Sequence, residues 1–129
     1  MILIVEDDPL ARRALEVLLA ANGYPTRTVS SAEEAIESLR NPDRPDLVLI
    51  DVDLPGMNGL ELLRWLRLNR PELHCTLMSA DSQERVRRSH EPVPFLPKPL
   101  DTRRLLSIAS ERHRRPDVDP ALAGHGEVH

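Results

Sequence analysis

The hydrophobic and polar positions along the chain follow two patterns, short aliphatic runs and longer segments of helical period. Unbroken aliphatic runs are typical of strands buried on both faces, and apolar spacings of three and four residues are typical of amphipathic helices. The strands predicted from these runs, including two less regular ones, cover residues 2–5, 24–29, 47–50, 74–79 and 93–97. The predicted helices begin near Pro9, Ala32, Gly59, Asp81 and Asp101.

Several helix ends carry recognisable capping signals. Asp8 precedes Pro9 and predicts an N-cap followed by proline at the first helical position. Ser31 and Glu34 have the spacing of a capping box, and Asp101 is expected to cap the last helix. The order of the elements, strand and helix in alternation, predicts βαβ units, a parallel sheet and helices on both of its faces. The fold class is therefore α/β.

Length and composition are consistent with one aliphatic domain. The chain has 129 residues, of which 40% are hydrophobic and only 2% are aromatic. Periodicity fades after residue 115, so we expect one domain over 1–115 and a flexible tail over 116–129. The predicted helix over 81–89 is charged and only weakly periodic.

Charge and cysteine content exclude several classes of protein. The net charge of -4 argues against non-specific nucleic-acid binding. Cys75 is the single cysteine, so neither an internal disulfide nor a CxxC metal motif is expected. The sequence shows no signal-peptide pattern and no apolar run near the roughly 20 residues that span a bilayer. We therefore expect a cytoplasmic protein without membrane contact.

Polar side chains follow four of the predicted strands, where parallel sheets bind ligands. They are Glu6 and Asp7 after the first strand, Asp51 after the third, Ser79 (followed by Ala80) at the end of the fourth, and Lys98 after the fifth. Carboxylates from neighbouring strands repel one another unless a cation joins them. Oxygen ligands without His or Cys favour Mg²⁺, and a carboxylate beside it can act as a nucleophile toward phosphorus. The edge therefore suits phosphoryl chemistry.

These motifs resemble the receiver domain of two-component response regulators, in particular the chemotaxis-regulator-like members. The resemblance is carried by residues 2–9, by 51–59 with its Leu-Pro-Gly-Met-Asn-Gly loop, by 79–80 and by the Lys98-Pro99 pair. It covers about residues 1–115. The family fold is a flavodoxin-like, doubly wound, five-stranded parallel sheet of order 2-1-3-4-5.

The resemblance implies roles around a phosphoacceptor. Asp51 would accept a phosphoryl group from the phosphohistidine of a sensor histidine kinase or a phosphotransfer protein. Glu6 and Asp7 would bind Mg²⁺, or Mn²⁺ in its place, together with Asp51 and the backbone carbonyl of Asp53. Ser79, Ala80 and Lys98 would bind the phosphoryl oxygens.

The resemblance also implies switching and timing. Phe95 would turn inward when Ser79 moves, although a phenylalanine at a strand end is more often plain core packing. Asp53 and Asp81 occupy places that tune hydrolysis of the phosphoryl group, and the direction of their effect stays open. Asp8 is better explained as a helix cap than as a metal ligand.

Together these residues predict a stand-alone receiver that catalyses only its own Mg-dependent phosphorylation and dephosphorylation and is otherwise not an enzyme. A conformational change would reach a downstream protein partner. Arginine clusters on the predicted helices over 81–89 and after Asp101 lie on the face that the family uses, with its fifth strand, for homodimers. A direct nucleic-acid contact is not expected.

Two other functions stay open. The Ser79–Lys98 interval of 19 positions is shorter than is usual in the family, and His90 to Pro94 carries prolines. A short or mobile fourth helix and a frayed fifth strand are therefore expected, which leaves room for a phosphorylation-independent binding module. Asp51-Val52-Asp53 also resembles the nucleophile motif of haloacid-dehalogenase-type phosphatases, but that class needs a further acidic motif and a cap.

Lysine usage bears on the predicted site. Of 17 basic residues only Lys98 is lysine, and the others are arginine. A coding bias explains the arginines, whereas a tight anionic pocket requires the compact ammonium of lysine. The sequence thus predicts that arginine cannot replace Lys98.

Overall fold

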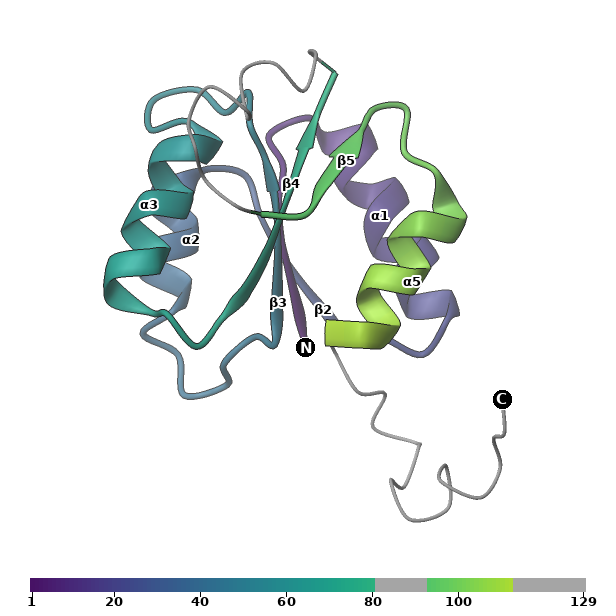
Figure 1. Ribbon diagram of the computed structural model, residues 1–129, viewed down its shortest axis with the longest axis horizontal. Helices are drawn as coiled ribbons and strands as arrows, with labels where there is room; N and C mark the ends of the chain where they lie inside the picture. Colours follow the sequence, from purple (N-terminus) through teal and green to yellow (C-terminus); the bar gives the residue numbers. More distant parts are fainter. Residues whose placement is uncertain (81–92, 113–129) are drawn as a thin grey trace.

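The computed structural model describes residues 1–80 and 93–112 (Figure 1). Its elements are, in chain order, β1 (Ile2–Val5), α1 (Pro9–Ala21), β2 (Thr26–Val29), α2 (Ala32–Ser38), β3 (Leu47–Asp51), α3 (Gly59–Asn69), β4 (His74–Ser79), β5 (Phe95–Pro97) and α5 (Thr102–Arg112). The helix predicted over 81–89, Asp81 and the predicted tail lie outside the described residues. None of the described helices is long and apolar enough to cross a membrane.

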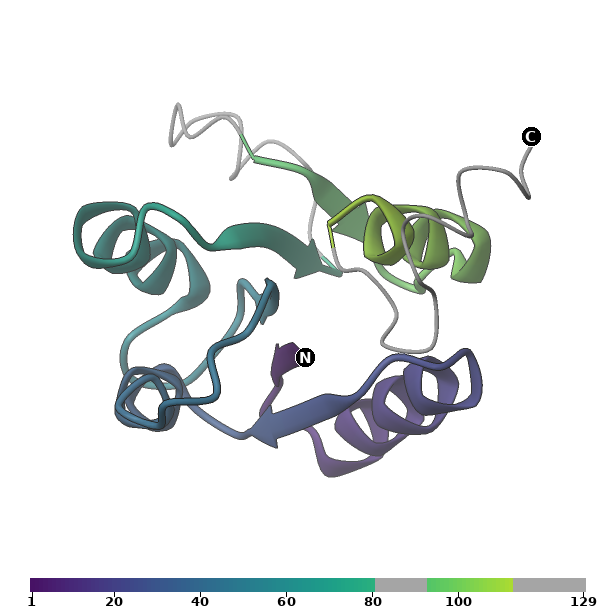
Figure 2. The same ribbon diagram turned by 90° about the horizontal axis from the view of Figure 1, so that it is seen from below.

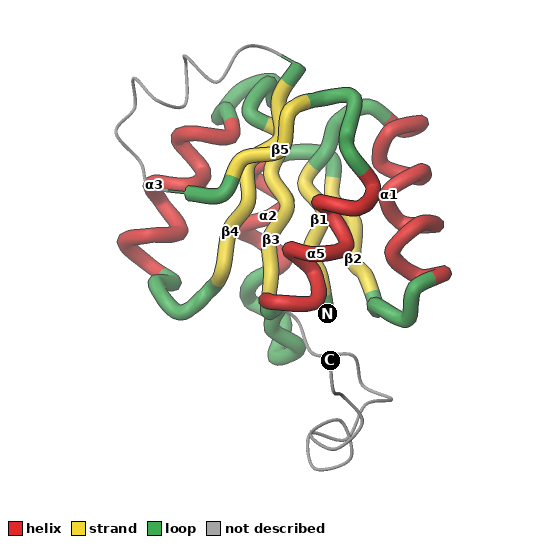
Figure 3. The backbone as a smooth tube through the Cα atoms, turned by 45° about the vertical axis from the view of Figure 1, so that its right-hand side comes forward, coloured by secondary structure: helices red, strands yellow, loops and turns green. Residues whose placement is uncertain are grey.

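The five strands form one parallel sheet of order β2-β1-β3-β4-β5, as predicted. Helices α1 and α5 cover one face, and α2 and α3 cover the other (Figures 1 and 2). The chain reverses its direction of winding between β1 and β3, so their carboxyl ends flank the switch-point crevice of the sheet. The loops that follow the strands gather at this end (Figure 3).

Alternate residues of the central strands supply two separate cores. Leu3, Val5, Val48 and Ile50 pack on the α2–α3 side, and Ile2, Ile4, Leu47 and Leu49 pack on the α1–α5 side. All of them are fully or almost fully buried. This explains why the β1 and β3 sequences are aliphatic without alternation, because both faces of a doubly covered sheet exclude water.

The predicted caps form, with one change of partner. Asp8 accepts a hydrogen bond from the Leu10 amide at 3.2 Å, and Ser31 Oγ accepts one from the Glu34 amide at 3.0 Å. The Glu34 carboxylate does not complete the box at Ser31; it accepts from the Ser30 amide and hydroxyl, each at 2.7 Å. These bonds lower the pKa of Glu34.

The two edge strands are shorter than predicted. β2 begins at Thr26, not at residue 24, and β5 begins at Phe95, not at residue 93. Proline accounts for both differences, because Pro25 and Pro94 lack the N–H group that a ladder needs and contribute only their carbonyls. Pro25 O accepts from the Ile2 amide at 2.8 Å, and Pro94 O accepts from the Leu77 amide at 3.0 Å.

The thiol of Cys75 on β4 is predicted to react slowly. Its side chain is buried in the core, and this burial raises its pKa from 9.0 to about 11 although the Arg67 charge opposes the shift. Because the thiolate is the reactive form, we expect alkylation by iodoacetamide at pH 8 to be about 100-fold slower in folded than in urea-unfolded protein. Intact mass against time measures both rates, and similar rates would contradict the buried position.

Candidate functional site

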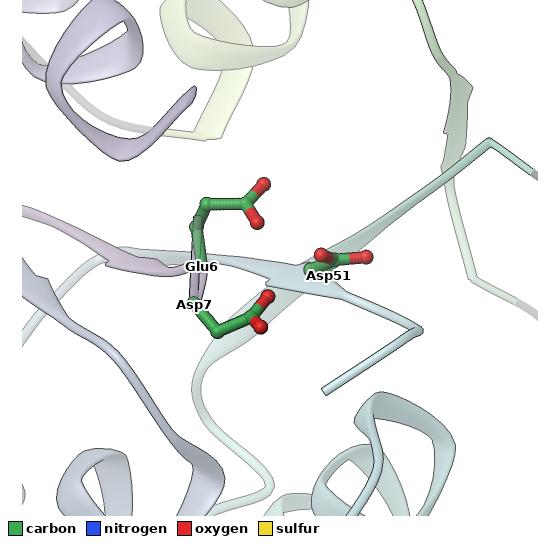
Figure 4. Close-up of side chains that lie close together, drawn as sticks. All are labelled: Glu6, Asp7 and Asp51. Atoms are coloured by element: carbon green, nitrogen blue, oxygen red, sulfur yellow. The ribbon is translucent and has the colours of Figure 1, made fainter. Parts of the chain in front are cut away.

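The site is built at the crevice between β1 and β3. Asp51 is the last residue of β3, and its side chain is almost fully buried, with the residue only 4% exposed. Glu6 follows β1 and is 1% exposed, whereas Asp7 beside it is exposed. Their carboxylates point toward Asp51 (Figure 4), and one oxygen from each of the three residues lies within 4.8 Å of the others. The structure thus brings together the three carboxylates among the four predicted metal ligands, the fourth being the backbone carbonyl of Asp53.

Lys98 reaches the same cluster from the end of β5. Its Nζ donates to Glu6 Oε1 at 2.7 Å and to Asp51 Oδ2 at 3.4 Å. The Lys98 backbone amide donates to the Ser79 carbonyl at 2.8 Å, so β4 fixes where the side chain starts. With 24% of the side chain exposed, the ammonium faces the crevice and not bulk solvent.

Burial and charge act together on the titrating groups. Burial raises the pKa of Glu6, and the Asp51 carboxylate adds to this effect, which the Lys98 hydrogen bond only partly offsets. Burial alone would lower the pKa of Lys98, but the carboxylates of Glu6 and Asp51 outweigh it and raise that pKa.

The donor set suits a divalent cation. The formal charges of three carboxylates and one ammonium sum to -2, which one divalent cation balances. Only oxygen ligands are present in the cluster, and Asp7 opens it to solvent, as a cation that keeps several waters requires. Mg²⁺ fits this arrangement better than a metal that prefers nitrogen or sulfur ligands.

Asp53 links the phosphoacceptor candidate to the β4 hydroxyl. Its amide donates to Asp51 Oδ1 at 3.0 Å, which helps to hold the Asp51 carboxylate in place. Its carboxylate accepts from the buried Ser79 hydroxyl at 3.3 Å. Ser79 therefore lies beside the predicted site with its hydroxyl directed at Asp53, and the exposed Ala80 follows it.

Phe95 lies in the core in this structure. It is buried, pairs with Leu77 across β4 and β5, and belongs to the hydrophobic cluster on the α2–α3 side. Arg104 of α5 donates to the Phe95 carbonyl at 3.3 Å. Packing alone accounts for this placement, and the switching role stays a prediction.

The structure adds features that the motif did not reveal. A Cβ atom on Gly59 would lie 2.3 Å from the Asp51 carbonyl oxygen, so α3 begins directly against the backbone of the Asp51 strand end. Asn58 and Glu61 form a full capping box at this helix start, with both bonds at 2.9 Å. The Asn-x-x-Glu spacing could have revealed the cap, but the close approach at Gly59 depends on tertiary packing.

Fold and site together define the class of protein: a flavodoxin-like α/β domain with an acidic crevice and a single lysine at the switch point. The family model of the response regulator receiver domain matches residues 2–110. The chain therefore belongs to the response regulator receiver family.

Individual relatives agree with this assignment. The chain is 31% identical over 122 residues to the DNA-binding response regulator MtrA of Mycolicibacterium smegmatis, with 93% of this chain and 53% of that protein covered. It is 36% identical over 124 residues to the response regulator MprA of Mycobacterium sp. (strain KMS), with 92% and 54% covered. The chain thus spans about half the length of these relatives.

Solved structures show the same architecture. A receiver protein of Pseudomonas putida is 32% identical, with a TM-score of 0.78 over 85% of this chain and 94% of that one. A CheY-like receiver domain of Methanospirillum hungatei JF-1 is 27% identical, with a TM-score of 0.76 over 85% and 90%.

Proposed function

We propose that the chain receives a phosphoryl group on Asp51 from the phosphohistidine of a sensor histidine kinase or a phosphotransfer protein. The observation that carries the proposal is the convergence of Glu6, Asp7 and Lys98 on the buried Asp51 carboxylate. An aspartate that only contributes to a solvated surface would not require a lysine and two further carboxylates around it. Membership of the receiver family supports the same role.

The transfer is a substitution at phosphorus. An Asp51 carboxylate oxygen bonds to phosphorus while the P–N bond of the phosphohistidine breaks, and the imidazole nitrogen keeps the electron pair and takes up a proton from solvent. The residues contribute position and charge more than covalent chemistry. The Asp53 amide holds one Asp51 oxygen, and the Lys98 ammonium compensates negative charge beside the other.

Bound Mg²⁺ would supply positive charge to the phosphoryl oxygens, with Glu6, Asp7, Asp51 and the Asp53 carbonyl as its protein ligands. Ser79 and the Ala80 backbone are proposed to bind the remaining phosphoryl oxygens. For this the Ser79 hydroxyl must leave the Asp53 carboxylate that it contacts in this structure. Water then hydrolyses the acyl phosphate to the free Asp51 carboxylate and inorganic phosphate, at a rate that Asp53 and Asp81 are proposed to tune, and no other substrate turnover is proposed.

Contacts with partners are proposed on two surfaces. A cavity of about 360 Å³ between α1 and α5 opens beside Glu6 and Lys98, and Ala11, Ala14, Leu15 and Leu18 of α1 line it. An apolar helix of the phosphodonor suits this position. The Ser79–Phe95 side of the sheet, with α5, is proposed to report phosphorylation to a downstream protein or to a second copy of the chain in the cytoplasm.

Phosphorylation of Asp51 is expected to change the mass of the chain by a defined amount. Incubation with acetyl phosphate and Mg²⁺ is expected to add about 80 Da to the wild-type chain, the mass of one phosphoryl group. Asp51→Ala should show no added mass. Asp51 is the carboxylate of the cluster that is buried, contacts Lys98 and accepts from the Asp53 amide, and the others lack this combination. Asp43→Ala, which removes an exposed loop acid, serves as the control and should be modified like the wild type.

Two further measurements, amide spectra and phosphate-ester turnover, separate the alternatives. A wild-type chain without an adduct, and with amide spectra unchanged by Mg²⁺ and beryllofluoride, would favour a phosphorylation-independent binding module. Release of many equivalents of product from p-nitrophenyl phosphate would favour a phosphatase. Either result would contradict the proposal.

A further inference from the structure

The guanidinium of Arg12 on α1 contacts the turn that carries two of the candidate metal ligands. Its Nη1 donates to the Glu6 carbonyl at 2.9 Å and lies 3.5 Å from the Asp7 carbonyl. The same guanidinium is close enough to Glu34 of α2 to contribute to the lowered pKa of that carboxyl. Arg12 thus connects α1, to which it belongs, with the turn after β1, and its charge reaches Glu34 of α2.

The turn after β1 has few backbone bonds of its own. The strand ladder ends at Val5, after which the Glu6 amide donates to the Val29 carbonyl at 3.1 Å. The Asp8 amide donates to Glu6 Oε2 at 3.3 Å. The Glu6 carbonyl beyond the ladder is partly buried, and a partner for such a group is needed to avoid a large desolvation cost. Arg12 supplies that partner through a charge-assisted hydrogen bond.

We propose that Arg12 is a positioning residue for the divalent-cation site. By holding the carbonyls of Glu6 and Asp7, it fixes the backbone from which their carboxylates face Asp51 before a cation binds. A residue that orients metal ligands does not touch the metal, but its substitution commonly lowers the metal affinity. The inference deepens the proposed function, since it rests on the same metal site.

Charge and position predict opposite effects for Arg12. The guanidinium is positive, so its charge alone repels a cation, and its removal would tighten binding. Loss of the hydrogen bond would instead loosen the turn and weaken binding. The direction of the change in affinity therefore decides between the two, which makes substitution of Arg12 by an uncharged residue informative.

The test compares Arg12→Gln with Arg13→Gln in the full chain. Arg13 is the matched control, because it carries the same charge one residue away but bonds to Glu16 on the helix surface at 2.8 Å. Titration calorimetry with Mg²⁺ is expected to show a dissociation constant about fivefold to tenfold higher for Arg12→Gln, in line with one lost charge-assisted bond. Arg13→Gln should bind as tightly as the wild type or slightly more tightly.

A measurement without metal isolates the turn. Amide hydrogen exchange at Asp8, whose amide bonds to the Glu6 carboxylate, is expected to speed up in metal-free Arg12→Gln and not in Arg13→Gln. Arg12→Gln is expected to melt at a somewhat lower temperature than Arg13→Gln, because the partly buried Glu6 carbonyl loses its partner. Binding and exchange are therefore measured well below both melting temperatures, where each variant is folded. Arg12→Lys, which keeps the charge and one donor, should recover part of the affinity.

Unchanged or tighter Mg²⁺ binding in Arg12→Gln, with unchanged exchange at Asp8, would overturn the inference. A wild-type chain that binds no divalent cation would overturn it too. A wild-type chain that binds Mg²⁺ yet takes up no phosphoryl group contradicts only the proposed function, and the inference about Arg12 then stands on its binding data.

Discussion

Replacing Gly59 with alanine is expected to lower the free energy of unfolding by about 3 kcal/mol, at the upper end for an overpacked site. The added Cβ would lie 2.3 Å from the Asp51 carbonyl oxygen and 2.7 Å from Val52 Cα. Both neighbours are backbone atoms, so a side-chain rotation cannot relieve the clash. Either the start of α3 or the strand end that carries Asp51 must move. Urea unfolding followed by circular dichroism measures the change.

Gly56 provides the matched control for this substitution. It has a φ of 72°, and the nearest atom to its added Cβ is a Glu33 carboxylate oxygen at 3.2 Å. That exposed side chain can move, although it accepts a hydrogen bond from the Met57 amide, so Gly56→Ala should cost little beyond the left-handed backbone term of about 1 kcal/mol. Equal losses in the two variants would show that the close approach at Gly59 does not decide stability. The phosphorylation rate should also fall in Gly59→Ala and not in Gly56→Ala.

Replacing Lys98 is expected to have the second large effect. Lys98→Met removes the positive charge that faces Asp51 and Glu6, and we expect aspartyl-phosphate formation from acetyl phosphate to slow by about 100-fold, as for other lost charge-stabilising groups. Lys98→Arg keeps the charge but is expected to recover no more than about a tenth of the wild-type rate. The guanidinium is broad and planar, whereas the ammonium meets Glu6 at 2.7 Å between buried carboxylates.

Arg103→Lys is the reciprocal control for the lysine prediction. Arg103 is exposed on α5, so exchange of its cation should leave the phosphorylation rate unchanged. Rates are compared at saturating Mg²⁺ by intact mass against time, and circular dichroism checks that each variant is folded. Wild-type rates in Lys98→Arg would show that the single lysine reflects composition and not a requirement of the pocket.

Much of the fold follows from local sequence. The aliphatic runs at 2–5 and 47–50 predict central strands because only a strand covered on both faces needs such residues at every position. Asp8, Ser31 and Asp101 mark helix starts because a cap is a short-range hydrogen bond. Strand ends were less predictable, since β2 and β5 lose residues where prolines withhold their N–H groups.

The sequence predicted which residues form the candidate site, but not which hydrogen bonds hold them there. Parallel strands place their carboxyl ends at one edge, so Glu6, Asp7, Asp51 and Lys98 were expected together, and their carboxylate and ammonium groups do meet. The sequence by itself therefore determined the fold class and the chemistry gathered at this edge.

Only the tertiary structure decided how these groups are held. The Ser79 hydroxyl bonds to Asp53, Arg12 holds the turn at Glu6, and Gly59 lets α3 approach Asp51. Each contact joins groups from separate parts of the chain, with distances set by how the helices and loops pack on the sheet. Residue spacing along the chain determines which residues reach an edge, but not which hydrogen bonds they make there.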